Sequence, residues 1–192
     1  TSVPLNIFEP RYLDMVNDSM KSDKFIGMVQ PREQKSTNSN LIELYNVGCL
    51  GKITNFTKAD DGRLLIELKG AIRFEIVKEI DSEKKYRTCE ISYENYLNDL
   101  NDLNENLKFS DLKLIFKDLK DLFSRRGFVI NWKELEKQSL NETINALAMA
   151  SPFTLEEKQV LLEAKDLKTR KTKISEILTT YTFDQYNNTT LQ

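Results

Sequence analysis

The chain has 192 residues, of which 40% are hydrophobic and 30% charged, and its formal net charge at pH 7 is −2. This length and composition allow a buried core in one domain or two small ones, and they exclude a disordered chain. The near balance of charges gives no electrostatic reason to expect nucleic acid or an anionic membrane as the main partner. No apolar run reaches the length of a membrane span and no secretory signal opens the chain, so we expect a cytoplasmic protein.

The residue types that carry most enzyme chemistry are scarce. Histidine is absent, which removes the commonest general base and the commonest metal ligand. The two cysteines, Cys49 and Cys89, fall in predicted strands and are expected to be buried thiols rather than a disulfide. Residues 48–52, Gly-Cys-Leu-Gly-Lys, have the wrong spacing for a phosphate-binding loop. We therefore predict that the protein is not an enzyme and has no catalytic residue, cofactor or metal site.

A strand-to-helix junction opens the chain. Pro10 follows an apolar segment, and its fixed φ suits the first turn of a helix, which we predict over residues 10–21. Arg11 lies one turn from Asp14 and two turns from Asp18. We therefore expect a small surface ion network among these three side chains.

Strands dominate the next part of the chain. Apolar runs at residues 24–30 and 41–45 predict two strands, and from Val47 to Tyr93 the apolar side chains alternate every two residues. We expect the turns between these later strands at residues 59–62, 69–70 and 81–85. About six short strands in close succession predict a mainly antiparallel sheet curled into a barrel.

After a polar connector the periodicity becomes helical. Ser110 is expected to cap a helix that runs to Arg126 and ends at Gly127. Capping-box patterns that begin at Ser139 and at Thr154 predict the starts of two further helices. A last helix follows before a polar tail that we expect to be loose.

The predicted fold class is thus α+β, with a barrel-like β-rich part followed by an α-helical bundle. We expect four parts: a β-rich subdomain at residues 1–94, a connector at 95–109, a helical bundle at 110–183 and a flexible tail at 184–192.

Three blocks of the sequence resemble, in order, those of one known family. The opening pattern P-L-x-I-F-E-P-R-Y is matched from Pro4 to Tyr12. The central blocks are Val47–Ile53, Asp61–Arg63 and Gly70–Phe74, and the helical block is Ser151–Phe153 with Glu157–Glu163. Together they resemble the substrate-binding domain of Lon-type ATP-dependent proteases over roughly residues 3 to 180, and more distantly the Lon-like domain of cereblon.

The resemblance implies a PUA-like barrel with an attached helical bundle. It also implies binding of unfolded or tagged polypeptides, together with a protease or adaptor partner. The ATPase and protease modules of Lon have no counterpart in this chain, so neither activity carries over. The family usually has a further apolar strand before the position of Pro4. Where that strand is missing, its neighbour would offer unpaired backbone groups to an extended peptide.

The candidate peptide-binding residues are Arg11, Phe25 and Met28. A packing role is the alternative for each of them. Two other functions stay open at this point: an adaptor that holds a folded partner through the helical half, and RNA binding. The acidic balance and the lack of a basic face studded with aromatic residues make RNA binding the less favoured of the two.

Overall fold

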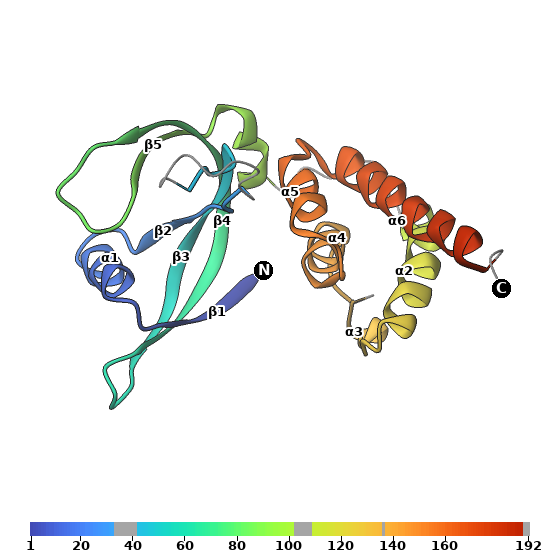
Figure 1. Ribbon diagram of the computed structural model, residues 1–192, viewed down its shortest axis with the longest axis horizontal. Helices are drawn as coiled ribbons and strands as arrows, with labels where there is room; N and C mark the ends of the chain where they lie inside the picture. The colour runs from blue at the N-terminus through green and yellow to red at the C-terminus, as the bar shows by residue number, and fades with distance from the viewer. Residues whose placement is uncertain (33–41, 102–108, 136, 190–192) are drawn as a thin grey trace. The chain divides into compact units, whose positions relative to one another are not determined.

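A computed structural model describes residues 1–32, 42–101, 109–135 and 137–189 (Figure 1). The chain forms two compact units, Thr1–Asp102 and Leu103–Gln192. The first is built on an antiparallel sheet and the second on helices, which confirms the predicted α+β class and its order along the chain. Each unit is described by itself below.

The β-rich unit contains a five-stranded antiparallel sheet. The strands run in the spatial order β1-β4-β3-β2, and β5 pairs with β4 outside this path. Their bounds are β1 (Ser2–Ile7), β2 (Phe25–Met28), β3 (Val47–Lys58), β4 (Leu64–Ile80) and β5 (Thr88–Ser92). β4 is the common partner of three strands, so β1 and β2 form the two ends of the path.

The predicted turn at residues 69–70 is wrong, because β4 runs through it without a break. Gly51 pairs with Gly70 and Leu50 pairs with Ile72, so Ala71 is an extra residue that shifts the register between the two strands. Glycine inside a strand marks such a bulge as readily as it marks a turn, and the alternation of side chains alone does not separate the two cases.

The predicted strand at 41–45 is also not a strand over its described residues. The chain there makes an isolated bridge between Pro31 and Leu44. It is held by the Arg32 N–H donating to the Glu43 carbonyl at 2.8 Å and the Tyr45 N–H donating to the Gln30 carbonyl at 3.0 Å. Two hydrogen bonds extend the β2–β3 pairing, but they are too few to build a further strand.

One face of the sheet is covered by α1 (Pro10–Met20), which begins one residue after Glu9 as the proline predicts. Val16 of this helix is fully buried against β2, β3 and β4. The buried side chains of this core, besides Val16, are Ile26, Ile53, Leu64, Ile66 and Leu68. The alternation predicted for β4 is therefore confirmed at the three buried positions between residues 64 and 68.

The ion network predicted on α1 has different partners. Arg11 pairs with Glu9, whereas Asp18 accepts from the Lys84 ammonium at 2.6 Å and from the Tyr86 hydroxyl at 2.9 Å. Lys84 and Tyr86 belong to the segment between β4 and β5, so α1 is tied to residues far away in sequence. Helical spacing alone cannot reveal such partners.

The 3₁₀ helix η1 (Glu94–Leu100) packs against β4. Arg73 of β4 donates to the Asp99 carboxylate through its backbone N–H at 3.0 Å, its Nε at 2.8 Å and its NH2 group at 2.6 Å. The guanidinium also lies over the Tyr96 ring, 4.4 Å from its centre. The segment predicted as a connector, 95–109, thus begins inside the β-rich unit, and its residues 102–108 lie outside the described chain.

The helical unit starts with the 3₁₀ helix η2 (Phe109–Leu112). The helices that follow are α2 (Lys113–Arg125), α3 (Trp132–Leu135), α4 (Leu140–Ala150), α5 (Leu155–Glu163) and α6 (Leu167–Thr189). Ser110 is not the cap of α2, because the 3₁₀ turn places Leu112 at that position. Helix α6 continues past residue 184, where we expected the loose tail to begin, and residues 190–192 lie outside the described chain.

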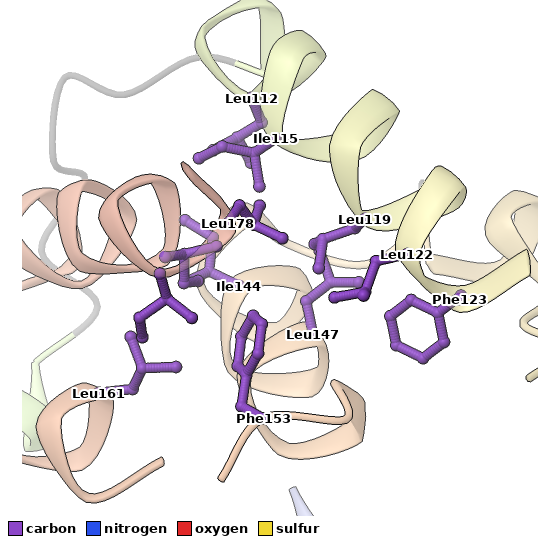
Figure 2. Packing of buried hydrophobic residues seen from close by; sticks show 12 residues of the cluster. Leu112, Ile115, Leu119, Leu122, Phe123, Ile144, Leu147, Phe153, Leu161 and Leu178 are labelled. Atoms are coloured by element: carbon purple, nitrogen blue, oxygen red, sulfur yellow. The ribbon is translucent and has the colours of Figure 1, made fainter. Parts of the chain in front are cut away.

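The other predicted helix boundaries, at Ser139, Thr154 and Gly127, are confirmed. Ser139 and Thr154 each form a capping box with the glutamate three residues later. Gly127 has φ +72°, a left-handed conformation that glycine adopts without strain just after a helix. The core of the unit is shown in Figure 2, where Leu112, Ile115, Leu119 and Leu122 lie near Ile144, Leu147, Phe153, Leu161 and Leu178.

Candidate functional site

β2 is an end strand of the sheet, and hydrogen bonds on either side of it fix which backbone groups face outward. The Ile53 N–H donates to the Lys24 carbonyl at 2.8 Å, and the Tyr45 N–H donates to the Gln30 carbonyl. Both acceptors are even-numbered residues that face β3 and its extension. Because successive residues of an extended chain point their backbone groups to opposite sides, Phe25 and Gly27 of β2, and Val29 directly after it, face away from β3.

We call these outward-facing groups the open edge of β2. The Phe25 carbonyl on this edge accepts from the Ser19 hydroxyl of α1 at 3.1 Å. Beyond Val29, Pro31 has no N–H to offer. Between these two limits, the N–H and carbonyl groups of Gly27 and Val29 make no hydrogen bond with any described residue. The open edge therefore presents two donors and two acceptors, one of each on Gly27 within β2 and one of each on Val29 just beyond its end.

The opposite end of the path is less suited to pairing. The Gly70 N–H donates to the Thr1 carbonyl at 3.0 Å, so the odd-numbered residues of β1 face β4 and the even-numbered ones face outward. Pro4 is the middle outward-facing residue, and proline in an edge strand removes a donor that a further strand would need. β1 thus has an interrupted edge, whereas that of β2 is continuous from Gly27 to Val29.

The predicted residues Phe25 and Met28 lie on β2, and their side chains are 37% and 46% exposed. They point to opposite faces of the strand, since their numbers differ in parity. Met28 shares the face of Ile26, which is buried under α1. Phe25 lies on the other face, where the Lys52 ammonium is 5.5 Å from the centre of its ring.

Gly27 has a packing role as well. A Cβ at this position would lie 3.2 Å from Cζ of the buried Phe74 ring, and one at Gly48 would lie 2.7 Å from the same atom. The absence of side chains at both glycines makes room for the Phe74 ring. Because Gly27 carries no side chain, its own outward-facing N–H and carbonyl groups are also not covered by a side chain.

Arg11, the third predicted residue, is on α1 and is held locally. Its Nε donates to the Glu9 carboxylate at 2.9 Å, and its guanidinium lies 4.5 Å from the centre of the Tyr12 ring. Half of its side chain is exposed. The structure therefore places two of the three predicted residues, Phe25 and Met28, on β2, and it places Arg11 on α1, where its hydrogen bond and ring contact are with Glu9 and Tyr12.

Apart from the open edge, the β-rich unit has a concave region with a volume of about 400 Å³. It is lined by charged and apolar side chains, among them Glu79, Arg87 and Cys89. Glu79 and Arg87 form a bidentate ion pair with two contacts of 2.6 Å. Burial raises the pKa of the Cys89 thiol, which keeps it protonated and poorly nucleophilic at neutral pH. The charges of Glu79 and Arg87 thus neutralise each other, and the Cys89 thiol is not activated as a nucleophile.

The part of the chain that the structure describes contains neither a metal-ligand cluster nor a membrane-spanning helix. In that part of the chain, no three side chains of the metal-binding types come together as a site. None of its helices combines the length and the apolar character needed to cross a bilayer.

Sequence reasoning found the exposed side chains of β2 but missed its backbone. Pro31 was the available signal, since proline tends to sit where a strand has an outward-facing N–H. The Ser19 cap has no such signal, because it depends on how α1 turns back onto β2 through Lys24, whose φ is +63°.

Comparisons of the sequence identify its relatives. The family model described as the ATP-dependent protease La (LON) substrate-binding domain matches residues 1–180. Lon protease of Flavobacterium johnsoniae is 28% identical over 173 residues, which are 88% of this chain and 21% of that protein. Lon protease 1 of Bdellovibrio bacteriovorus is 24% identical over 173 residues, covering 90% of this chain and 22% of its own length. The chain thus spans about a fifth of the length of these curated relatives.

Solved structures agree with the sequence match. A Lon N-terminal domain protein from Xanthomonas campestris superposes with a TM-score of 0.63 at 20% identity, covering 93% of this chain and 89% of that one. The N-terminal domain of a Mycobacterium avium complex Lon protease gives a TM-score of 0.58 at 15% identity, with 93% and 90% covered. At these identities the likeness concerns the fold. With the family model extending over residues 1–180, the chain belongs to the LON substrate-binding domain family.

Proposed function

We propose that this chain is a non-catalytic module that binds unfolded or tagged polypeptides. The observation that carries the proposal is the pair of exposed apolar side chains, Phe25 and Met28, on an end strand of a sheet. An end strand with apolar side chains on both faces is suited to extended peptides, which gain main-chain hydrogen bonds and side-chain contacts together. The family membership supports the same class of ligand.

The proposal extends to a protease or adaptor as the partner that receives the bound polypeptide. The domain that this chain matches is described by its substrate binding. Among the described residues, no three His, Cys, Asp or Glu side chains come together to hold a metal ion. The role we propose is to hold a client rather than to change it.

The test is a titration of the protein with a fluorescently labelled unfolded polypeptide. We expect binding tighter than millimolar, and we expect Phe25→Ser and Met28→Ser each to weaken it. Leu65→Ser is the matched control, because Leu65 is 49% exposed on β4 and does not belong to β2. No binding by the unmodified chain, or equal weakening by the control, would contradict the proposal.

An adaptor role through the helical unit is the second candidate. It is favoured by Phe128 and Val129, which are 52% and 99% exposed just after α2. The Phe128 ring rests edge-on against Phe123, 6.0 Å between ring centres, so the exposed segment is anchored to the core. The test is to recover a folded partner protein from cells with the unmodified chain and with each variant. If Val129→Asp no longer binds this partner and Phe25→Ser still does, the result favours the adaptor role over the first proposal.

A further inference from the structure

We infer that the open edge of β2 binds its client by strand addition. The occupant is an extended apolar segment of another polypeptide, aligned with Gly27 and Val29. This inference rests on the proposed function and specifies its binding mode. The remaining steps concern the backbone, the limits of the site and the charge beside it.

The backbone next to Gly27 and Val29 can pair with a further strand. Gly27 and Val29 each direct one N–H and one carbonyl away from β3, as the bonds made by Lys24 and Gln30 on the opposite side of β2 require. A peptide strand pairs with such residues by exchanging two hydrogen bonds at each. Side chains add specificity to this pairing, because alternate residues of the added strand would lie beside Phe25 on one face and Met28 on the other.

The limits of the site set the length of the client. At one end the Phe25 carbonyl is already occupied by the Ser19 hydroxyl. At the other end Pro31 lacks an N–H and closes the ladder. The window between them suits a short segment of about three to five residues rather than a long strand, since only Gly27 and Val29 can pair fully.

The charge beside the site favours an acidic residue in the client. Lys52 lies opposite Phe25 in the ladder, and Lys69 lies opposite Lys52 on the next strand. Like charges directly opposite each other repel, and neither lysine has an ion pair within the described residues. Glu67, the nearest acid along β4, is hydrogen-bonded to Asn55 at 2.6 Å. An aspartate or glutamate next to the apolar segment would therefore be attracted at the Phe25 end of the edge.

Val29→Pro is the decisive variant. It removes the outward N–H of Val29 and places a ring on the open edge, while the β2–β3 hydrogen bonds remain because they involve the even-numbered residues. Asn6→Pro makes the same change at an outward-facing residue of β1 and is the matched control. Val29→Thr keeps the N–H and the shape of the side chain, so it controls for a change in packing beside Gly48.

The probe is a short fluorescent peptide rich in valine and isoleucine with two aspartates at one end, titrated by fluorescence anisotropy into the full chain. We expect Val29→Pro to weaken binding by about tenfold or more, and Asn6→Pro and Val29→Thr to leave it unchanged. Two methylated peptides are compared, one with methyl groups on the backbone nitrogens of its odd-numbered residues and one with them on the even-numbered residues. One of the two should lose binding, because its methylated nitrogens face β2, and the other should keep it. Replacing the aspartates by lysines should weaken binding by roughly threefold.

The outcomes separate the two levels of the proposal. If the unmodified chain binds no peptide, the proposed function fails and strand addition fails with it. If the chain binds but Val29→Pro and both methylated peptides bind equally well, polypeptide binding stands and strand addition is refuted. If the chain is a dimer that Val29→Pro dissociates, the occupant is a second copy and the inference of a client on this edge is overturned.

Discussion

The ion pair between Arg73 and Asp99 offers a quantitative test of what holds η1 on β4. The side chain of Arg73 is 7% exposed and that of Asp99 is 21% exposed. The two are joined by three hydrogen bonds of 2.6 to 3.0 Å. Removing one partner of a buried ion pair leaves the other charge buried without a counter-charge. For a fully buried pair this lowers the free energy of unfolding by about 3–5 kcal/mol.

The unequal burial of the two side chains predicts an order of effects. Asp99→Ala leaves the more buried guanidinium without its carboxylate and also deprives the Arg73 N–H of its acceptor, so we expect a loss of about 4 kcal/mol in the free energy of unfolding. Arg73→Met leaves the partly exposed carboxylate, which water can still solvate, so we expect a loss of about 2 kcal/mol. The double variant should lose less than the sum of the two.

Urea unfolding followed by far-UV circular dichroism reports the unfolding of both units, so the losses of the β-rich unit are read from the transition that tryptophan fluorescence does not show. The protein has a single tryptophan, Trp132, which lies in the helical unit and provides a separate fluorescence signal for it. The reasoning is refuted if Arg73→Met costs as much as Asp99→Ala, or if the double variant shows additive losses. A cost below about 1 kcal/mol for Asp99→Ala would show that η1 is held by other contacts.

Three further predictions concern the helical unit. Leu119→Ala, at a residue with no exposed surface, should lower its stability by about 2–5 kcal/mol in urea titrations read by tryptophan fluorescence, and an unchanged midpoint would contradict the core described here. Ser139→Ala removes the hydroxyl that caps α4 and should cost about 1 kcal/mol, whereas Ser139→Asp should retain most of the stability. Burial and the hydrogen bond to Glu157 raise the pKa of Tyr181 to about 12, so its contribution to stability is present below pH 10 and is lost as the pH rises through 12. In an ultraviolet titration, Tyr181→Phe should lack one tyrosine that titrates late in the unmodified protein; identical titration curves would refute the assignment.

Helix boundaries with local causes were predictable from the sequence. The capping boxes at Ser139 and Thr154 need only residues within four positions of each other, and both form as predicted. Pro10 at the start of α1 and Gly127 after α2 are likewise determined by their own φ angles. Ser110 does not cap α2, because it lies within a 3₁₀ turn that precedes the helix. A short 3₁₀ turn at a helix start and a capped helix start can have the same residue types, so the sequence does not separate them.

Features that depend on distant partners were not predictable. The strand alternation identified β3 and β4 but placed a turn at Gly70, where the sheet instead accommodates an extra residue. Asp18 was assigned to a helical neighbour, yet it bonds to Lys84 and Tyr86. The pairing of Arg73 with Asp99 joins residues 26 positions apart, and no local pattern connects them.

The amino-acid sequence by itself determined the two kinds of architecture, their order along the chain and the apolar residues of β2. These follow from periodicity, capping and chain stiffness, which act between neighbours in the chain. Only the tertiary structure decided which backbone groups of β2 point outward and that the edge extends from Gly27 to Val29 between a cap and a proline. Strand order and register arise from packing between segments far apart in sequence, and a shift of one residue would exchange the outward-facing groups for those that bond to β3.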